Sequence, residues 1–193
     1  MKNFYWDSCV ITSFLNQEDD NADLPSLNRF VLDAKHGECR IFASTITIAE
    51  ILPSYLKDKK FSNYQKFLED MEGAMVQISP TANILSLSAR LRDIEYSKTV
   101  NRHTKAIRKM DVPDAIILAT AVVLTEGHGV ALDAFHTYDD GGKRSTDGGR
   151  CVPILSFQDW CGQLGKRQTA LANKVIALNR KLPIHPTPDL PGV

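Results

Sequence analysis

Four acids in this sequence stand where predicted strands end or predicted helices begin. Asp7 follows the short run NFYW, and Glu50 lies about one helical turn into the segment that follows CRIFAS. Asp114 opens the apolar run AIILATAVV, and Asp139 follows AFHTY. Like charges a few ångströms apart repel by roughly 4 kcal/mol per pair in a partly screened protein environment. If these acids meet in the fold, they therefore need bound cations or raised pKa values.

The order of the predicted elements places these acids at one end of a sheet. Five strands are predicted, at 3–6, 39–44, 74–79, 132–140 and 152–155; helices separate the first four, and a glycine-rich loop separates the last two. Strands that alternate with helices indicate an α/β fold with a parallel sheet, here of about four or five strands. Ligand sites of such sheets lie beyond the carboxyl ends of the strands. We therefore expect the acids to face a common site there.

The donor chemistry of this predicted site favours a hard cation. Carboxylate oxygens without histidine or cysteine are typical ligands of Mg²⁺ or Mn²⁺. Each acid alone has an ordinary explanation: Asp114 can complement the helix dipole, Asp7 can cap a helix, and Asp139 can belong to a turn. The combination of all four, in strand-helix order, is what indicates a metal site.

Four segments of the chain resemble the PIN-domain nucleases, a family that includes VapC-type toxins. The segments are YWDSCVI, ASTITIAEIL, PDAIILATAVV and DAFHTYDDG, in the order of the family. The resemblance implies a three-layer α/β/α fold and a metal-dependent endoribonuclease that uses Mg²⁺ or Mn²⁺. It implies that Asp7, Glu50, Asp114 and Asp139 are the catalytic acids and metal ligands, and that Thr137 helps to orient metal or water. It also implies an antitoxin protein and a homodimer as partners.

The fourth acid has close neighbours in the sequence. Asp133, Asp140 and Asp111 are further candidates for its role. Asp139 is preferred over Asp133, because Asp133 precedes the apolar stretch and would lie at the wrong end of that strand. The choice between Asp139 and Asp140 stays open from the sequence.

Two basic segments border the predicted pocket. The formal net charge of the chain is zero, so a polyanion such as RNA must be held by a local patch. The segment before Asp114 is expected to bind RNA phosphates through Arg102, Lys105, Arg108 and Lys109. The glycine-rich loop after Asp139 adds Lys143, Arg144 and Arg150. Single-stranded or looped RNA is the expected substrate, since its bases leave the scissile phosphate accessible.

The chain divides into two parts by composition. Residues 1–164 hold the matched segments and form the predicted nuclease domain, and residues 165–193 form a predicted helix with a proline-rich tail. This extension has no counterpart in the matched motifs and can cover the groove, form a dimer contact or bind a partner. No apolar run approaches the roughly 20 residues that span a membrane, so no membrane partner is expected. Four cysteines without zinc-site spacing favour a cytoplasmic location.

Other classes of protein fit the sequence less well. A haloacid-dehalogenase-type phosphatase requires an aspartate two residues after its first one, and Cys9 stands at that position. A response-regulator receiver requires paired acids near the start, where Asp7 is single. The remaining alternative is a catalytically inactive PIN-like module that serves as an RNA-binding or protein-interaction scaffold.

Overall fold

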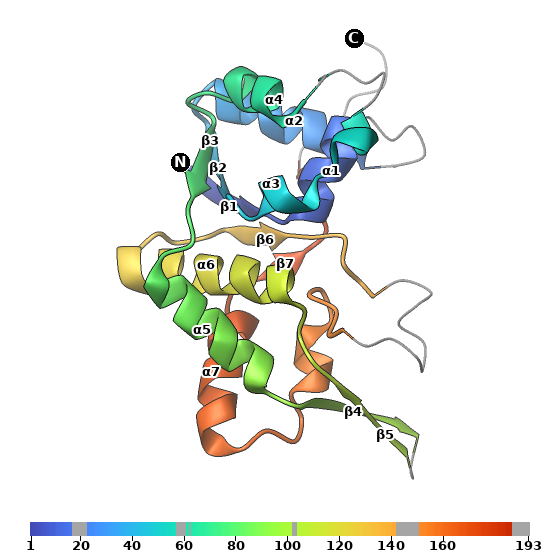
Figure 1. Ribbon diagram of the computed structural model, residues 1–193. Coiled ribbons are helices and arrows are strands. Elements are labelled where there is room, and N and C mark those ends of the chain that lie inside the picture. Colours follow the sequence, from blue (N-terminus) through green and yellow to red (C-terminus); the bar gives the residue numbers. More distant parts are fainter. Residues whose placement is uncertain (17–22, 57–60, 62, 102–103, 142–150, 187–193) are drawn as a thin grey trace.

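A parallel sheet of five strands forms the centre of the computed structural model (Figure 1). The structure describes residues 1–16, 23–56, 61, 63–101, 104–141 and 151–186. In the order β3-β2-β1-β6-β7, the strands are Met75–Ile78, Cys39–Ser44, Lys2–Trp6, Ala134–His136 and Arg180–Lys181. All neighbouring strands pair in parallel. The predicted α/β fold with a parallel sheet of four or five strands is confirmed.

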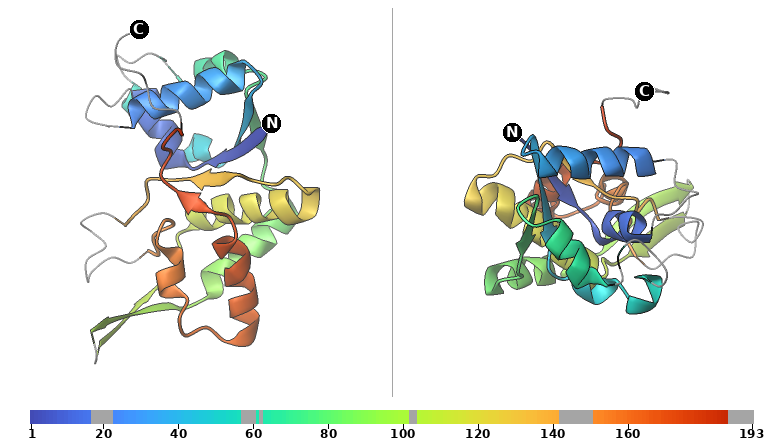
Figure 2. Two further views of the ribbon diagram at one scale, coloured as in Figure 1. Left: turned by 180° about the vertical axis from the view of Figure 1, so that it is seen from behind. Right: turned by 90° about the horizontal axis from the view of Figure 1, so that it is seen from above.

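Helices cover both faces of this sheet, which gives three layers (Figures 1 and 2). The first layer contains α1 (Ser8–Asn16), α2 (Leu24–Lys35), α3 (Thr47–Glu50), the 3-10 helix η1 (Pro53–Leu56) and α4 (Tyr64–Asp70). The second layer contains α5 (Ala82–Asp93), α6 (Val112–His128), the 3-10 helix η3 (Phe157–Trp160) and α7 (Lys166–Ile176). The three-layer α/β/α arrangement expected from the sequence is therefore present.

Alternation along the strands divides the core into two clusters. Phe4 and Trp6 of β1 pack with the helices of the first layer, whereas Tyr5 packs with α5 and α6 of the second. The predicted central helix is α6, which is apolar almost all round and is buried from Ala115 to Val122. Because α6 is held by apolar burial along its length, the position of its first turn is fixed by the core.

The sheet edge next to β6 differs from the sequence prediction. The strand predicted at 152–155 is wrong: Cys151 makes only an isolated bridge with Lys109, and Val152 and Ile154 are buried in the core without joining the sheet. β7 pairs with β6 instead. Residues 156–164, between this segment and α7, contain only the short η3.

The basic segment before α6 forms an antiparallel hairpin. Its strands are β4 (Tyr96–Asn101) and β5 (Thr104–Arg108), and they project away from the sheet (Figure 1). Sequence analysis assigned no strand here, because the hairpin contributes few buried apolar side chains. Tyr96 is its anchor in the core, where its ring lies edge-on to Phe157.

The C-terminal segment passes the β7 edge of the sheet, from one helical layer to the other (Figure 2, left). The helix expected after Gly165 is α7, and its residues Leu171 and Val175 pack in the same cluster as α6. Beyond β7, His185 lies 3.0 Å from Asp33 of α2 and edge-on to Phe30. Residues 165–186 are thus part of the packed fold. No helix in the described ranges is long and apolar enough to cross a membrane.

This packing predicts that α7 unfolds together with the sheet. Leu171→Ala should lower the free energy of unfolding by about 2–4 kcal/mol, because it leaves a cavity between α7 and α6. Urea unfolding followed by circular dichroism measures the change, and the exposed Lys166→Ala on the same helix is the control. An unchanged main transition in Leu171→Ala would show that α7 is an independent appendage.

Candidate acidic site

Asp7 stands directly after β1 and is 2% exposed. Its Oδ1 accepts a hydrogen bond from the backbone N–H of Ser8 at 2.7 Å. Its Oδ2 accepts from the Thr137 hydroxyl at 2.7 Å and from the Cys9 thiol at 3.1 Å. Burial raises the pKa of Asp7, and these hydrogen bonds oppose the rise. The end of β1 thus carries a buried carboxyl group of fixed orientation.

Asp139 is tied to the same network through Thr137. The Thr137 hydroxyl oxygen accepts from the backbone N–H of Asp139 at 3.0 Å while it donates to Asp7. Asp139 Oδ1 accepts from the N–H of Gly141 at 3.1 Å, and Oδ2 accepts from the N–H of Ile154 at 2.8 Å. Burial raises the pKa of Asp139, and these two backbone hydrogen bonds oppose the rise. Thr137, predicted to orient metal or water, thus contacts the carboxyl group of Asp7 and the backbone of Asp139.

Asp114 lies in the first turn of α6, and Asp111 caps that helix by accepting from the N–H of Val112 at 2.7 Å. Burial raises the pKa of Asp114 to about 8, and repulsion from Asp7, Asp139 and Glu50 adds to the rise. The α6 dipole favours an ionised acid here, but burial and neighbouring charge outweigh it. Asp114 is thus placed where its negative charge is unfavourable.

Glu50 is the last residue of α3 and faces the same group of acids. Burial raises its pKa to about 7, the Ser8 side chain opposes the rise, and repulsion from Asp7 adds to it. Its Oε2 is buried and has no hydrogen-bond partner among the described residues. The structure therefore brings the four acids predicted from the sequence into electrostatic contact.

The neighbouring acids take different positions. Asp133 precedes β6 at the opposite end of the sheet, where its Oδ2 accepts from the N–H of Asn3 at 2.8 Å. Asp140 is exposed, whereas Asp139 is half-buried and acts on the pKa values of Asp7 and Asp114. Asp139 is therefore the acid near β6 that repels Asp7 and Asp114, and Asp140 in turn repels Asp139.

The cluster fits a hard divalent cation in donor type and in charge, but its atoms do not form a closed ligand set. Within the described ranges, no three carboxylate, imidazole or thiol groups are arranged to hold one metal ion. Charge repulsion between the acids requires only that they lie near one another, whereas a metal ion requires oxygens within about 2.0–2.6 Å of one point. Glu50 Oε2 accepts no hydrogen bond from the described residues, so it can approach a cation without giving one up. Binding would therefore require side-chain movement.

Cys9 is a member of the site that sequence analysis did not assign to it. Its thiol donates to Asp7, and its sulfur accepts from the backbone N–H of Tyr138 at 3.2 Å. It thus connects the start of α1 to the chain that leaves β6. Its position two residues after Asp7 is the only sequence signal that could have indicated this contact.

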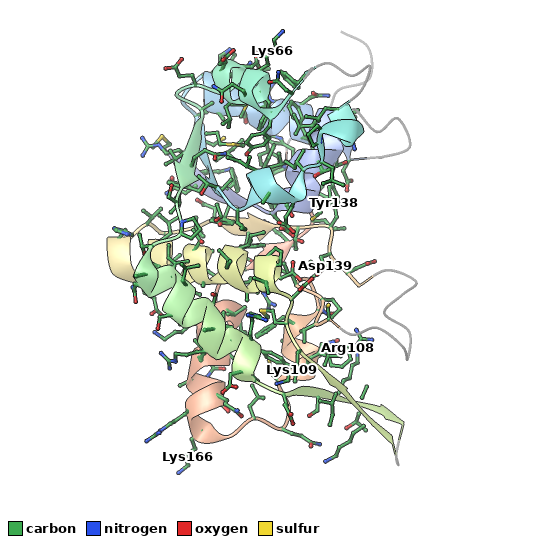
Figure 3. The ribbon with its side chains drawn as sticks, in the orientation of Figure 1. Lys66, Arg108, Lys109, Tyr138, Asp139 and Lys166 are labelled. Atoms are coloured by element: carbon green, nitrogen blue, oxygen red, sulfur yellow. The ribbon has the colours of Figure 1, made fainter. Side chains whose placement is uncertain are left out.

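The predicted phosphate-binding residues separate into two kinds. Lys105 and Lys109 are exposed, whereas Arg108 is buried: its guanidinium lies 4.1 Å from the centre of the Trp160 ring and donates to the Cys151 carbonyl at 3.2 Å. Arg108 and Lys109 lie near the base of the hairpin, on the Asp139 side of the molecule (Figure 3). The remaining predicted cations, Arg102, Lys143, Arg144 and Arg150, lie outside the described residues.

Comparison with known proteins adds no relative. None of the family models, curated proteins or solved structures compared with the chain matches it. The functional argument therefore rests on the residues and geometry described above.

The acidic site predicts that the protein loses stability as the pH rises. Unfolded carboxyl groups have pKa values of about 4, whereas those of Glu50 and Asp114 are about 7 and about 8 here. Between these values the folded chain binds more protons than the unfolded chain, so the free energy of unfolding falls with rising pH. Asp114→Asn should reduce this fall between pH 5 and pH 8 by roughly 1–3 kcal/mol.

Urea unfolding at both pH values, in the presence of a chelator, measures this difference. Asp93→Asn, at the exposed C-terminal end of α5, is the control and should behave as wild type. An equal fall in wild type and Asp114→Asn would mean that Asp114 does not carry the repulsion.

The contrast between Arg108 and Lys105 gives a second prediction. Arg108→Ala should lower the free energy of unfolding by about 1–3 kcal/mol, because it removes the contact with Trp160 and the hydrogen bond to Cys151. Lys105→Ala should stay within about 0.5 kcal/mol of wild type, because its side chain is exposed. Thermal or urea unfolding of both variants tests this, and a stable Arg108→Ala protein would contradict the buried role.

Proposed function

We propose that this protein is a metal-dependent endoribonuclease of the PIN-like kind, which hydrolyses RNA phosphodiester bonds with Mg²⁺ or Mn²⁺. The observation that carries the proposal is the group of Asp7, Glu50, Asp114 and Asp139 at one end of the sheet, with pKa values raised by burial and, for Asp7, Glu50 and Asp114, by mutual repulsion. Such a group destabilises the fold near neutral pH, and perturbed acids of this kind are typical of functional sites. A bound cation would convert the repulsion into attraction.

The residues of the chain then have separate tasks. A divalent cation, when bound, lowers the pKa of water and neutralises charge that develops on a phosphate. Thr137 holds Asp7 and Asp139 in position through its hydroxyl group. Glu50, whose Oε2 accepts no hydrogen bond from the described residues, can hold the cation or orient the attacking water. Lys105 and Lys109 are exposed and can bind the RNA backbone.

The resemblance to VapC-type toxins extends this proposal to the setting in which the enzyme acts. It adds the toxin of a toxin–antitoxin pair as the biological role, with an antitoxin and a second copy of the chain as partners. The four cysteines without zinc-site spacing favour the cytoplasm as the location of such an enzyme.

A specific observation favours one alternative, a catalytically inactive scaffold that binds RNA or protein. Both carboxylate oxygens of Asp7 and of Asp139 already accept hydrogen bonds from the protein, and no three metal-binding groups of the described residues converge. Such a site can be stable without metal when its acids are protonated. Metal binding and cleavage separate the two functions.

The decisive test is cleavage of a mixed pool of single-stranded and structured RNA, with Mg²⁺, with Mn²⁺ and with a chelator. We expect metal-dependent cleavage that falls at least about 100-fold in the Asp7→Asn, Asp114→Asn double variant, because loss of outer contacts alone commonly costs 10–100-fold. Loss of cleavage in the double variant excludes a contaminating nuclease, and Asp93→Asn, purified in the same way, should cut like wild type. Circular dichroism checks that the double variant is folded.

Two other outcomes point elsewhere. Metal binding by calorimetry without cleavage of the pool would restrict the proposal to a narrow RNA target or an inhibited state. Neither binding nor cleavage, in a folded wild-type protein, would favour the scaffold.

A further inference from the structure

A pocket of about 710 Å³ opens beside the acidic site. It is continuous with that site, because Ser8 and Cys9 line the pocket and also hydrogen-bond to Asp7. Glu50 belongs to both the pocket and the acid group. Its volume lies within the roughly 300–1,000 Å³ of ordinary ligand sites. A molecule held at the acids can therefore extend into this pocket.

The lining of the pocket combines apolar faces with hydrogen-bond acceptors. Tyr138, Leu155 and Leu182 supply the aromatic and aliphatic surface. Asp23 and Asp140 add carboxylates, and hydroxyl groups of α1 complete the wall. Seven of the ten lining residues carry no charge, so the pocket fits a flat, largely neutral group that has hydrogen-bond donors on its edge.

Part of this wall comes from the C-terminal segment. Leu182 follows β7, whose Lys181 carbonyl accepts from the N–H of Thr137 at 3.1 Å. The Arg180 guanidinium donates to the Ile154 carbonyl at 2.8 Å, and the N–H of Leu155 donates to the Asp139 carbonyl at 2.8 Å. Thr137 is thus hydrogen-bonded to the segment that carries Leu182, and Asp139 is hydrogen-bonded to Leu155 itself.

We propose that this pocket binds the base of the nucleotide next to the scissile phosphate of single-stranded RNA, with a preference for guanine. The proposal rests on the proposed ribonuclease function, because it gives that site its substrate selectivity. Unstacked bases bind proteins by stacking on aromatic side chains and by hydrogen bonds at their edges. Tyr138 provides the ring, and the two leucines provide the apolar contact.

The acceptors of the pocket decide which base fits. Ionised carboxylates only accept hydrogen bonds. Guanine presents two adjacent donors, N1–H and the N2 amino group, which match the two oxygens of one carboxylate. Adenine and cytosine present one amino group beside an acceptor, and uracil presents one N–H between two acceptors. The order of affinity is therefore guanine first and uracil last.

A cationic side chain of a partner protein is the competing occupant, since it would also meet Asp23, Asp140 and Glu50. The uncharged majority of the lining and the continuity with the acidic site favour the base. The two occupants differ in what they need: a cation needs only negative charge, whereas a base needs the apolar faces as well.

The test measures binding without catalysis. Guanosine, adenosine, cytidine, uridine and Nα-acetylarginine amide are titrated into the full chain with a chelator present, and binding is followed by NMR chemical-shift changes. We expect guanosine to bind at least about 5-fold tighter than uridine and tighter than the arginine compound. Leu182→Ala, whose side chain is partly exposed at the surface, should weaken guanosine binding at least about 3-fold.

The Asp23→Asn, Asp140→Asn double variant should remove the preference for guanosine over uridine, while Asp93→Asn retains it. Equal binding of all four nucleosides, no nucleoside binding, or tighter binding of the arginine compound would each overturn the proposal. Guanosine binding that depends on Leu182, in a protein that never cuts RNA with Mg²⁺ or Mn²⁺, would uphold the pocket and reject the nuclease. Metal-dependent cleavage without nucleoside binding would uphold the nuclease and reject the pocket as a base-binding site.

Discussion

The hydrogen bond from the Thr137 hydroxyl to Asp7 joins the two strand ends on which the site depends. β1 and β6 are neighbours in the sheet, so the residues that follow them are brought together by strand pairing. The same hydroxyl oxygen accepts from the N–H of Asp139. One buried side chain therefore connects two acids that are far apart in the sequence, through the carboxyl group of Asp7 and the backbone of Asp139. A buried hydrogen-bonded network of this kind is costly to leave incomplete, which fixes its geometry.

The unfavourable charge at this site is maintained by packing elsewhere. Asp114 cannot move away from Asp7, because the turns of α6 that follow it are buried between the sheet and α5. The free energy of apolar burial along that helix is much larger than the repulsion at its first turn. The acid is therefore retained where it is least stable as an anion. An exposed helix would simply have turned Asp114 toward water.

Local sequence pattern was sufficient for the strands and acids but insufficient for contacts made by tertiary packing. Short apolar runs identify β1 and β2, as is typical of strands in a buried parallel sheet, and the acids that follow such strands are predictable from sheet geometry. β7 contains only Arg180 and Lys181, whose composition carries no strand signal. Ile154, conversely, belongs to an apolar run that resembles a strand. Its apolar side chain is explained by burial against the second helical layer. The sequence predicts Arg108 as a phosphate ligand, because its contact with Trp160, over 50 residues later, is made only in the folded chain.

The acidic site and the adjoining pocket have different origins in the chain. The acids come from residues 7–139, within the segments that resemble the nuclease family, whereas Leu182 comes from the extension beyond Gly165. Strand pairing between β6 and β7 connects the two, since Thr137 N–H donates to the Lys181 carbonyl while the Thr137 hydroxyl donates to Asp7. A change in the extension can therefore alter the wall of the pocket without changing any acid. Leu182 would therefore contribute to the choice of RNA without taking part in hydrolysis.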